Sequence, residues 1–466
     1  MEHKAEIHRQ EGTRVEQVVS LIQQRISSRS LAPGARLPSI RSLAGTLGFS
    51  NSTVVEAYDR LSAEGVILSR RGSGFYVAGH LPPLSLADLA PRLDRAVDPL
   101  WVSRQSLEAD EGFLKPGCGW MPPGWMPEAS IRKALRTISR GDESLLVDYA
   151  TPLGSLPLRG LLAQRLINSG LDVVPDQILL TDSGTQAIDL LCRFLIEPGA
   201  TVLVDDPCYF NFHAILRAHR ARVVSVPFTP AGPDPDAFAQ VLKEERPRLY
   251  ITNTALQNPT GATLSPVIAH KILKLIEDSG MIVVEDDTFA DFEHETAPRL
   301  AAFDGLERVI HIGSFSKRLS ASVRCGYIVA RPDWVEGLVD LKIATTFGAG
   351  NLSAGLIHTV LKDGSYRRHM ESLRTRLARS MGETRQRLGA VGIRPWIMPK
   401  GGMYLWCQLP DGADAADLAR KALSENIVLA PGNVFSQSSS ASGFLRFNVT
   451  QSSDPRIYEV LKRLMA

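Results

Sequence analysis

Three observations in the sequence predict an α/β protein with two unlike parts. Residues 14–78 hold short helical patterns that end in a Gly-rich hairpin signal. Over residues 178–330, apolar runs of four to six residues alternate with helical patterns, which is typical of a mostly parallel sheet covered on both faces by helices. Residues 79–110 carry prolines at 82, 83, 91 and 99 and favour a partly extended linker. We therefore expect a small domain at 1–78, a linker at 79–110 and a larger domain at 111–466.

Composition limits the class of protein. The 466 residues are 44% hydrophobic and 22% charged, with a net charge of +2, which is ordinary for a soluble globular protein. No apolar run approaches the roughly 20 residues of a membrane helix, and the polar first twelve residues lack the apolar core of a secretory signal. The five cysteines are scattered without a CxxC pair. This spacing argues against a disulfide framework or a metal site, so we expect a cytoplasmic protein.

The N-terminal part predicts a winged helix–turn–helix. Apolar residues recur at helical spacing from Val15 to Ile26, and Ser39 can cap a second helix. A third helical pattern runs from Val54 to Leu61 and stops at Gly65. The stretch "VILSRRGSGFYV" then alternates around a Gly-Ser-Gly turn, as a hairpin does. The pattern alone leaves open a small helical interaction module.

The larger part predicts strands at 178–183, 201–206, 248–254, 281–287, 308–315 and 324–330, with helices at 185–196 and 265–280. In such sheets ligands bind at the carboxyl ends of the strands. Lys317 follows one predicted strand, in "GSFSKRLSASVR". The small hydroxyl residues before it can bind an anion. A lysine beside a phosphate site suits a Schiff base with pyridoxal 5'-phosphate, and the alternative is a solvated surface lysine.

The other groups that this cofactor requires have candidates at neighbouring strand ends. Asp286, in "VVEDDTFADF", can pair with the ring nitrogen, Asn258, in "QNPTG", can donate to the ring oxygen, and the Tyr209 ring can stack on the cofactor. Amides at a helix N-terminus bind phosphate, and the strand-to-helix turn carries Ser183, Gly184 and Thr185. Singly, each has an ordinary alternative as a turn, a helix cap or a core residue.

Residues 31–77 resemble the DNA-binding domain of GntR regulators. The resemblance rests on "LAPGARLPSIRSLAGTLGFSNSTVVEAYDRLSAEGVILSRRGSGFYV", with Asn51 where the family usually has arginine. It implies contacts to the DNA backbone or groove edge by Arg36, Ser39 and Arg41. It also implies a recognition helix opened by Ser50, Asn51 and Thr53, and a minor-groove wing formed by Arg70, Arg71, Gly72 and Gly74.

Residues 115–466 resemble fold-type I aminotransferases, through "YATPLG", "SGTQA", "DDPCY", "NPTG", "EDD", "SFSK" and "FLRFNV". The resemblance implies a three-layer large domain at about 145–355 and a smaller α+β domain formed by 356–466 with 111–144. It adds Ser314 and Arg324 to the phosphate site of Lys317, and gives Tyr149 to the phosphate of a partner subunit. Arg446 would bind a substrate or effector carboxylate, with an ordinary salt bridge as the alternative. Thr288 and Phe289 stand where such enzymes usually carry a tyrosine that donates to the ring oxygen.

The two halves together resemble the MocR/GabR-type subfamily of GntR regulators. This resemblance implies a homodimer with exchanged DNA-binding domains, an operator of double-stranded DNA, and an effector that is pyridoxal phosphate, an amino compound or both. A working aminotransferase with a vestigial N-terminal module is the alternative that the retained site residues keep open. A scaffolding protein would explain neither Lys317 nor the wing.

Overall fold

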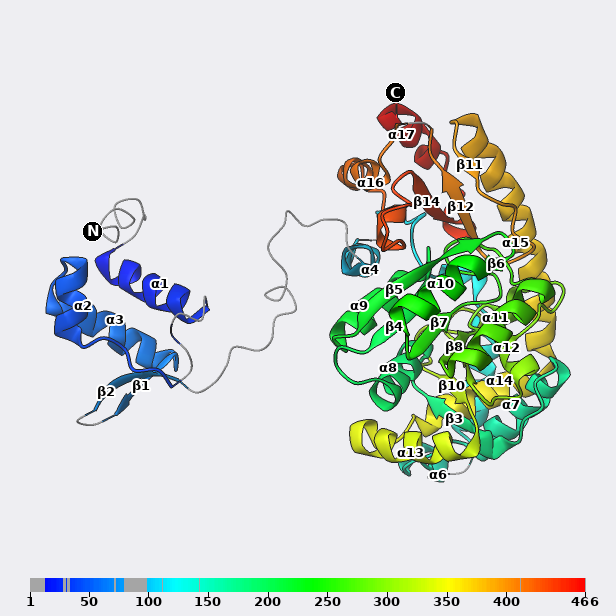
Figure 1. The fold of residues 1–466 in the computed structure, drawn as a ribbon, viewed down its shortest axis with the longest axis horizontal. Coiled ribbons are helices and arrows are strands. Elements are labelled where there is room, and N and C mark those ends of the chain that lie inside the picture. The colour runs from blue at the N-terminus through cyan, green and yellow to red at the C-terminus, as the bar shows by residue number, and fades with distance from the viewer. Residues whose placement is uncertain are drawn as a thin grey trace. The chain divides into compact units, whose positions relative to one another are not determined.

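A computed structural model describes residues 13–27, 31, 34–70, 73–78, 99–110, 112–141, 143–410 and 412–465. The chain forms two compact units, Met1–Ala96 and Val97–Ala466 (Figure 1). The described part contains no helix that is both long enough and apolar enough to span a bilayer.

The first unit is three helices followed by a two-stranded hairpin: α1 (Arg14–Ser27), α2 (Ile40–Leu47), α3 (Asn51–Ala63), β1 (Ile67–Arg70) and β2 (Gly74–Val77). Its core gathers apolar residues from all these elements, among them Val18, Leu43, Val54 and Ile67. The Tyr58 hydroxyl donates to the Pro38 carbonyl oxygen at 2.9 Å and ties α3 to the segment before α2. The predicted order of helices and hairpin is confirmed.

The second unit is built on an eight-stranded sheet with the order β3-β10-β9-β8-β7-β4-β5-β6. Strands β5, β4, β7, β8 and β9 are parallel, whereas β10 runs antiparallel between β9 and β3 and β6 antiparallel to β5. The strands are β3 (Ile178–Thr181), β4 (Thr201–Asp206), β5 (Arg222–Thr229), β6 (Gly232–Pro233), β7 (Leu249–Thr252), β8 (Ile282–Asp286), β9 (Val309–Ser314) and β10 (Gly326–Val329).

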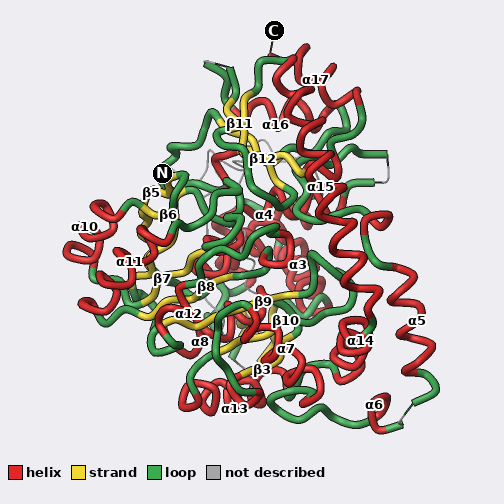
Figure 2. Tube along the Cα trace, turned by 90° about the vertical axis from the view of Figure 1, so that its right-hand side faces the viewer, coloured by secondary structure: helices red, strands yellow, loops and turns green. Residues whose placement is uncertain are grey.

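Successive residues of these strands point to opposite faces, and both faces are buried. In β3, Leu179 belongs to one apolar cluster and Leu180 to the other. Helices cover one face with α8 (Gly184–Leu195), α9 (Phe210–Ala218) and α13 (Pro332–Thr346). The other face carries α7 (Leu156–Asn168), α10 (Pro235–Glu245), α11 (Pro266–Ser279), α12 (Leu300–Asp304) and α14 (Asn351–Lys362). The expected three layers are present (Figure 2).

A second, antiparallel sheet lies in the C-terminal part, with the order β11-β12-β14-β13. Its strands are β11 (Arg394–Pro395), β12 (Tyr404–Gln408), β13 (Ala430–Pro431) and β14 (Phe444–Asn448). The helices of this part are α15 (Gly364–Ala390), α16 (Ala415–Ser424) and α17 (Pro455–Met465). Helices α5 (Glu128–Ile138) and α6 (Ser144–Val147) precede the large sheet in the chain.

The linker expected at 79–110 differs from the structure in its last third. Residues 79–98 lie outside the described residues, but α4 (Pro99–Glu108) is a helix of the second unit. Its Val102 is buried with Phe210 of α9 and with Trp406 and Phe435 of the C-terminal part. Proline is well tolerated at the first position of a helix, so Pro99 begins this helix instead of marking extended chain.

Candidate functional site

A cavity opens at the edge of the large sheet where β8 and β9 end. It brings together most of the side chains that the sequence predicts for cofactor binding: Ser183, Gly184, Thr185, Tyr209, Asn258, Asp286, Ser314, Lys317 and Arg324. Tyr149 is not among the lining residues and is 83% exposed. Thr288 and Phe289, which the sequence places beside the cofactor, also line the cavity. Other lining residues were not predicted from the sequence: Val102, Ser103 and Ser106 of α4, Gly119, Trp120, Ser316 and Tyr404.

Lys317 supplies an amine to this cavity. Its Nζ donates a hydrogen bond to the Gly119 carbonyl oxygen at 2.7 Å. Burial lowers the pKa of Lys317 to about 8, because the charged form loses its hydration. The neutral, nucleophilic form is therefore accessible near physiological pH.

Asp286 supplies the only carboxylate among the lining residues of the cavity. Its Oδ1 accepts hydrogen bonds from the Thr288 backbone N–H at 3.0 Å and from the Thr288 hydroxyl at 2.6 Å. Burial raises the pKa of Asp286 to about 6, and the Thr288 hydrogen bonds oppose that rise. A cationic group in the cavity would relieve this cost.

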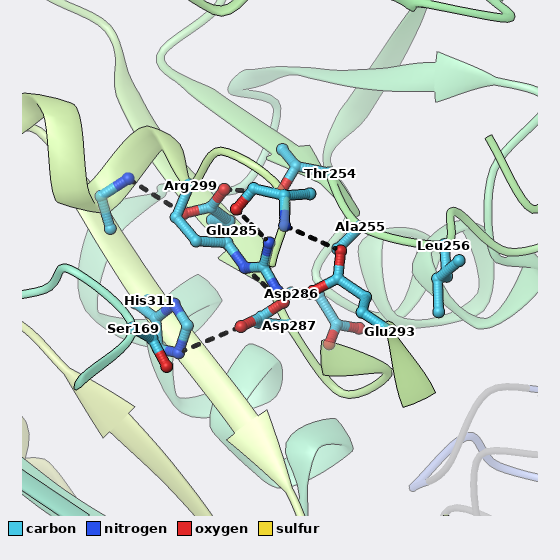
Figure 3. Close-up of polar contacts among 12 residues, drawn as sticks. Ser169, Thr254, Ala255, Leu256, Glu285, Asp286, Asp287, Glu293, Arg299 and His311 are labelled. Atoms are coloured by element: carbon cyan, nitrogen blue, oxygen red, sulfur yellow. Dashed lines mark hydrogen bonds and ion pairs between the residues drawn. The ribbon is translucent and has the colours of Figure 1, made fainter. Parts of the chain in front are cut away.

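The carboxylates on either side of Asp286, those of Glu285 and Asp287, do not line the cavity and contact other residues instead (Figure 3). Glu285 accepts from the Thr254 hydroxyl and from two backbone amides at the start of α12. Asp287 forms an ion pair with the buried Arg299 at 2.8 Å, and Arg299 also pairs with Glu293 at 2.5 Å. These pairings fix the chain on both sides of Asp286 and leave its carboxylate as the one that faces the cavity.

The residues that the sequence predicts for anion binding lie around the start of α8. Ser183 caps this helix, since its Oγ accepts from the Gln186 N–H at 3.0 Å. Gly326 allows β10 to lie close to the start of α8, because a Cβ at this position would lie only 2.8 Å from the Gly184 nitrogen. Helix N-terminal amides, the Ser314 hydroxyl and the exposed Arg324 therefore face one volume, as a phosphate requires.

Arg446 of β14 is a buried cation, 1% exposed, that lies next to the cavity but is not among its lining residues. Its Nη1 donates to Asn258 Oδ1 and its Nη2 to the Gly117 carbonyl oxygen, both at 2.8 Å. Its Cζ lies 4.3 Å from the centroid of the Tyr404 ring, and its Nε has no partner among the described residues. None of the ion pairs in the described part of the chain involves Arg446, so the salt-bridge alternative finds no partner there. Burying a charge without a counterion is costly, and an anionic ligand beside Arg446 would offset that cost.

Gly119 separates Lys317 from Arg446. A Cβ at Gly119 would lie 3.8 Å from Arg446 Nη2, 3.9 Å from Lys317 Nζ and 3.9 Å from the Tyr404 hydroxyl. The space beside Gly119 is therefore bounded by an amine, a guanidinium and a phenol. The only sequence signal for this arrangement is the glycine in "KPGCGW", which is too common a feature to have identified it.

In the first unit the predicted DNA-contacting residues fall into two groups. The hydroxyls of Ser39 and Ser50 serve as N-caps of α2 and α3, while Arg41 and Asn51 are exposed in the first turns of those helices. The Thr53 N–H donates to Ser50 Oγ. The remaining predicted positions belong to the hairpin: Arg36 packs against Gly74, Arg70 ends β1, and Arg71 and Gly72 lie outside the described residues.

Comparison with known proteins agrees with both parts. Residues 124–464 match the family model "Aminotransferase class I and II", and residues 5–77 match "Bacterial regulatory proteins, gntR family". The chain is 28% identical over 463 residues to the uncharacterised HTH-type transcriptional regulator YdcR of Escherichia coli, covering 96% of this chain and 97% of that protein. It is 32% identical over 362 residues to the 2-aminoadipate transaminase of Thermus thermophilus, covering 76% of this chain and 89% of the enzyme.

Among solved structures, the chain is similar to the α-aminoadipate aminotransferase LysN of Thermus thermophilus, complexed with N-(5'-phosphopyridoxyl)-L-leucine. The TM-score is 0.72 at 28% identity, covering 82% of this chain and 98% of that one.

Proposed function

The chain belongs to the aminotransferase class I and II family and carries a GntR-family domain, which is the MocR/GabR-type architecture. From this premise we propose that the protein is a pyridoxal phosphate-dependent transcriptional regulator. The observation that carries the proposal is the coexistence of two sites in one chain. Lys317 and Asp286 face one cavity, and Asn51 and Arg41 are exposed on a helix–turn–helix.

The residues of the cavity fit the cofactor. A buried carboxylate with a raised pKa suits a protonated ring nitrogen, and an amine with a lowered pKa suits an aldehyde. Ser183, Gly184, Thr185, Ser314 and Arg324 would hold the phosphate, and the Tyr209 ring would cover the pyridine face. When bound, pyridoxal phosphate supplies an aldehyde that condenses with amines and a ring that withdraws electrons.

The effector class follows from the groups around Gly119. Arg446 offers a buried guanidinium that has no carboxylate partner among the described residues, and Lys317 marks the position of the reactive amine. A compound with both an amino group and a carboxylate matches these two groups, and an amino-acid adduct of the cofactor is bound in the LysN complex named above. We therefore include amino acids among the proposed effectors, beside pyridoxal phosphate itself.

The proposal includes a homodimer. Tyr149 and Phe347 form an exposed aromatic pair with ring centroids 5.1 Å apart, and Val147 beside them is 79% exposed. Exposed apolar surface of this kind is typical of a protein interface. Tyr149 would then contact the phosphate site of the partner subunit, and paired DNA-binding domains, exchanged between subunits, would suit an operator with two half-sites.

A working aminotransferase is the second candidate, and the 32% identity to a transaminase favours it. Phe289 opposes it, because its side chain cannot donate to the ring oxygen. In the structure the Phe289 ring packs edge-on against Tyr404 instead, with centroids 5.5 Å apart.

The deciding experiment uses the full-length protein with pyridoxal phosphate, a panel of amino acids with 2-oxo acids, and the DNA immediately upstream of its coding region. We expect borohydride to fix the cofactor on Lys317 and amino compounds to change the affinity for this DNA. Sustained turnover at roughly 1 per second or more, without specific DNA binding, would establish the enzyme instead.

A further inference from the structure

Five consecutive backbone carbonyls beside the cavity, those of residues 116–120, are all hydrogen bonded to side chains or backbone of the C-terminal part and of the lysine segment. We call residues 116–120 the strap. Pro116 O accepts from the Asn448 N–H at 2.7 Å, and Cys118 O and Trp120 O accept from Asn448 Nδ2 at 3.0 and 2.8 Å. These bonds fasten the strap to β14.

The other two carbonyls are held by the cations of the proposed ligand site. Gly117 O accepts from Arg446 Nη2 at 2.8 Å. Gly119 O accepts from Lys317 Nζ at 2.7 Å and from the Tyr404 hydroxyl at 2.9 Å. Hydrogen bonds from charged donors are stronger than neutral ones. Among the described side chains that donate to the strap carbonyls, only Lys317 belongs to the part with the large sheet, where it follows β9. Arg446 and Asn448 lie in β14, Tyr404 lies in β12, and Gln451, which donates to Trp120 O, follows β14.

Condensation of an aldehyde with Lys317 must change this grip. The amine nitrogen and the aldehyde carbon form a double bond, and the carbonyl oxygen leaves as water with two hydrogens from the neutral amine. The nitrogen then carries at most one hydrogen, when protonated, in place of the three of the ammonium group. Gly119 O therefore loses the ammonium donor and keeps the Tyr404 hydroxyl. The strap thereby loses its direct hydrogen bond from Lys317 and keeps those from β12 and β14.

Helix α4 contacts both parts of the second unit and the residue before the strap, so loss of the Lys317 hydrogen bond would affect it. Val102 packs against Phe210 of α9, which covers the large sheet, and against Trp406 and Phe435 of the C-terminal part. Lys115, directly before the strap, donates to the Ala109 carbonyl oxygen just after α4 at 2.7 Å. Ser106 is 2% exposed, lines the cavity, and has no hydrogen-bond partner for its Oγ among the described residues. This hydroxyl is therefore free to contact a ligand.

We propose that the hydrogen bond from Lys317 to Gly119 O is a reversible tie between the strap and the large sheet. We propose further that breaking this tie changes the position or mobility of α4, and that α4 transmits the change along the chain to the DNA-binding domain. This inference rests on the proposed function, because it assigns the regulation of that same site. Helix α4 is the first element of the second unit that the structure describes, and the chain leads from it back to the DNA-binding domain. The strap is a two-state element, tied or untied, whose equilibrium depends on the occupant of the cavity.

The test measures amide hydrogen exchange of peptides covering α4 and the strap in the full-length protein, with and without pyridoxal phosphate. We expect attachment of the cofactor to raise the exchange rate of these peptides roughly tenfold, because one charge-assisted hydrogen bond is lost. Lys317→Met, which can neither donate nor condense, should exchange as fast without cofactor as the loaded wild type and should not respond to it. It should also bind the upstream DNA as the loaded wild type does.

Lys342→Met is the matched control. Lys342 is another buried lysine, and its Nζ donates to a carbonyl, that of Pro152, at the same 2.7 Å. Its loss should leave exchange of the strap, and the response to cofactor, as in the wild type. Should Lys317→Met fold poorly, Tyr404→Phe gives a second measurement, because the loaded variant then has no donor left for Gly119 O and should exchange faster than the loaded wild type.

The outcomes separate this inference from the proposed function. Cofactor fixed on Lys317 and specific DNA binding, with unchanged exchange in α4 and the strap, would overturn the tie and leave the regulator intact. Failure of the cofactor to attach would overturn the regulator, while the cofactor-free comparison of Lys317→Met with the wild type would still decide whether the tie exists.

Discussion

The Thr288 hydroxyl donates a hydrogen bond to Oδ1 of Asp286, with 2.6 Å between the two oxygens. Its backbone N–H donates to the same oxygen at 3.0 Å. The Thr288 hydroxyl therefore donates to the carboxylate and does not replace the tyrosine hydroxyl that usually donates to the ring oxygen in such enzymes. These two hydrogen bonds favour the ionised form of Asp286 against the effect of burial, but Thr288 is then not the donor to the cofactor's ring oxygen.

Thr288→Val should weaken cofactor binding. Losing the hydroxyl removes an interaction that favours the ionised carboxylate, so the pKa of Asp286 should rise further above about 6. We expect the dissociation constant of pyridoxal phosphate at neutral pH to rise about three- to tenfold, measured by absorbance titration. Thr288→Ser keeps the hydroxyl and is the control. Equal affinities of the valine and serine variants would contradict the assigned hydrogen bond.

The rate of cofactor attachment should level off near pH 8. Burial lowers the pKa of Lys317 from 10.5 to about 8, so the neutral amine predominates above that pH. The same shift affects the free energy of unfolding. The buried ammonium group destabilises the cofactor-free protein below about pH 8, and this destabilisation decreases as the pH rises toward 10.5. Stopped-flow absorbance at several pH values measures the rate. A rate still climbing steeply at about pH 9.5 would indicate a lysine without this shift.

The sequence predicts the parts of the site that lie next to recognisable elements. Asp286 ends a buried strand, Lys317 follows another, and Ser183 opens a helix, so each can be placed at the same edge of a parallel sheet. These positions can be predicted because the end of a strand and the start of a helix are each recognisable from the residue types of a short segment.

The rest of the site depends on contacts that no local pattern reports. Gly119 and Lys317 are 198 positions apart in the chain, yet they share a hydrogen bond. Helix α4 was hidden by the prolines around it, because a composition rich in proline predicts a linker whether or not one proline begins a helix. Thr288 could be placed beside the site, but only the structure shows which oxygen its hydroxyl contacts.

Val147→Glu should weaken the proposed dimer. Val147 lies beside the exposed aromatic pair of Tyr149 and Phe347, and a carboxylate there would lose its hydration in an interface. We expect the dimer dissociation constant to rise about tenfold or more, measured by sedimentation equilibrium. Val267→Glu, at a 65% exposed valine of α11, is the matched control and should have no effect. A monomeric wild type would refute the dimer itself.

Arg299→Met should destabilise the second unit strongly. Arg299 is 5% exposed and pairs with both Asp287 and Glu293, so its loss leaves two buried carboxylates without a counterion (Figure 3). We expect a loss of about 3–5 kcal/mol in the free energy of unfolding, measured by urea denaturation. Arg132→Met breaks the exposed pair with Glu128 and should cost under about 1 kcal/mol. Similar losses for the two variants would contradict the difference in burial.

Asn51→Ala should weaken specific DNA binding without unfolding the first unit. Asn51 is exposed at the first position of α3, where a recognition helix reaches base edges, whereas Ser50 spends its hydroxyl on the cap of that helix. Anisotropy titrations with the upstream DNA should show a loss of about 1–3 kcal/mol for Asn51→Ala, with unchanged thermal unfolding. Ser50→Ala should instead cost about 1 kcal/mol of stability. A weaker affinity for unrelated DNA to the same extent would mean that Asn51 contacts the backbone and reads no base.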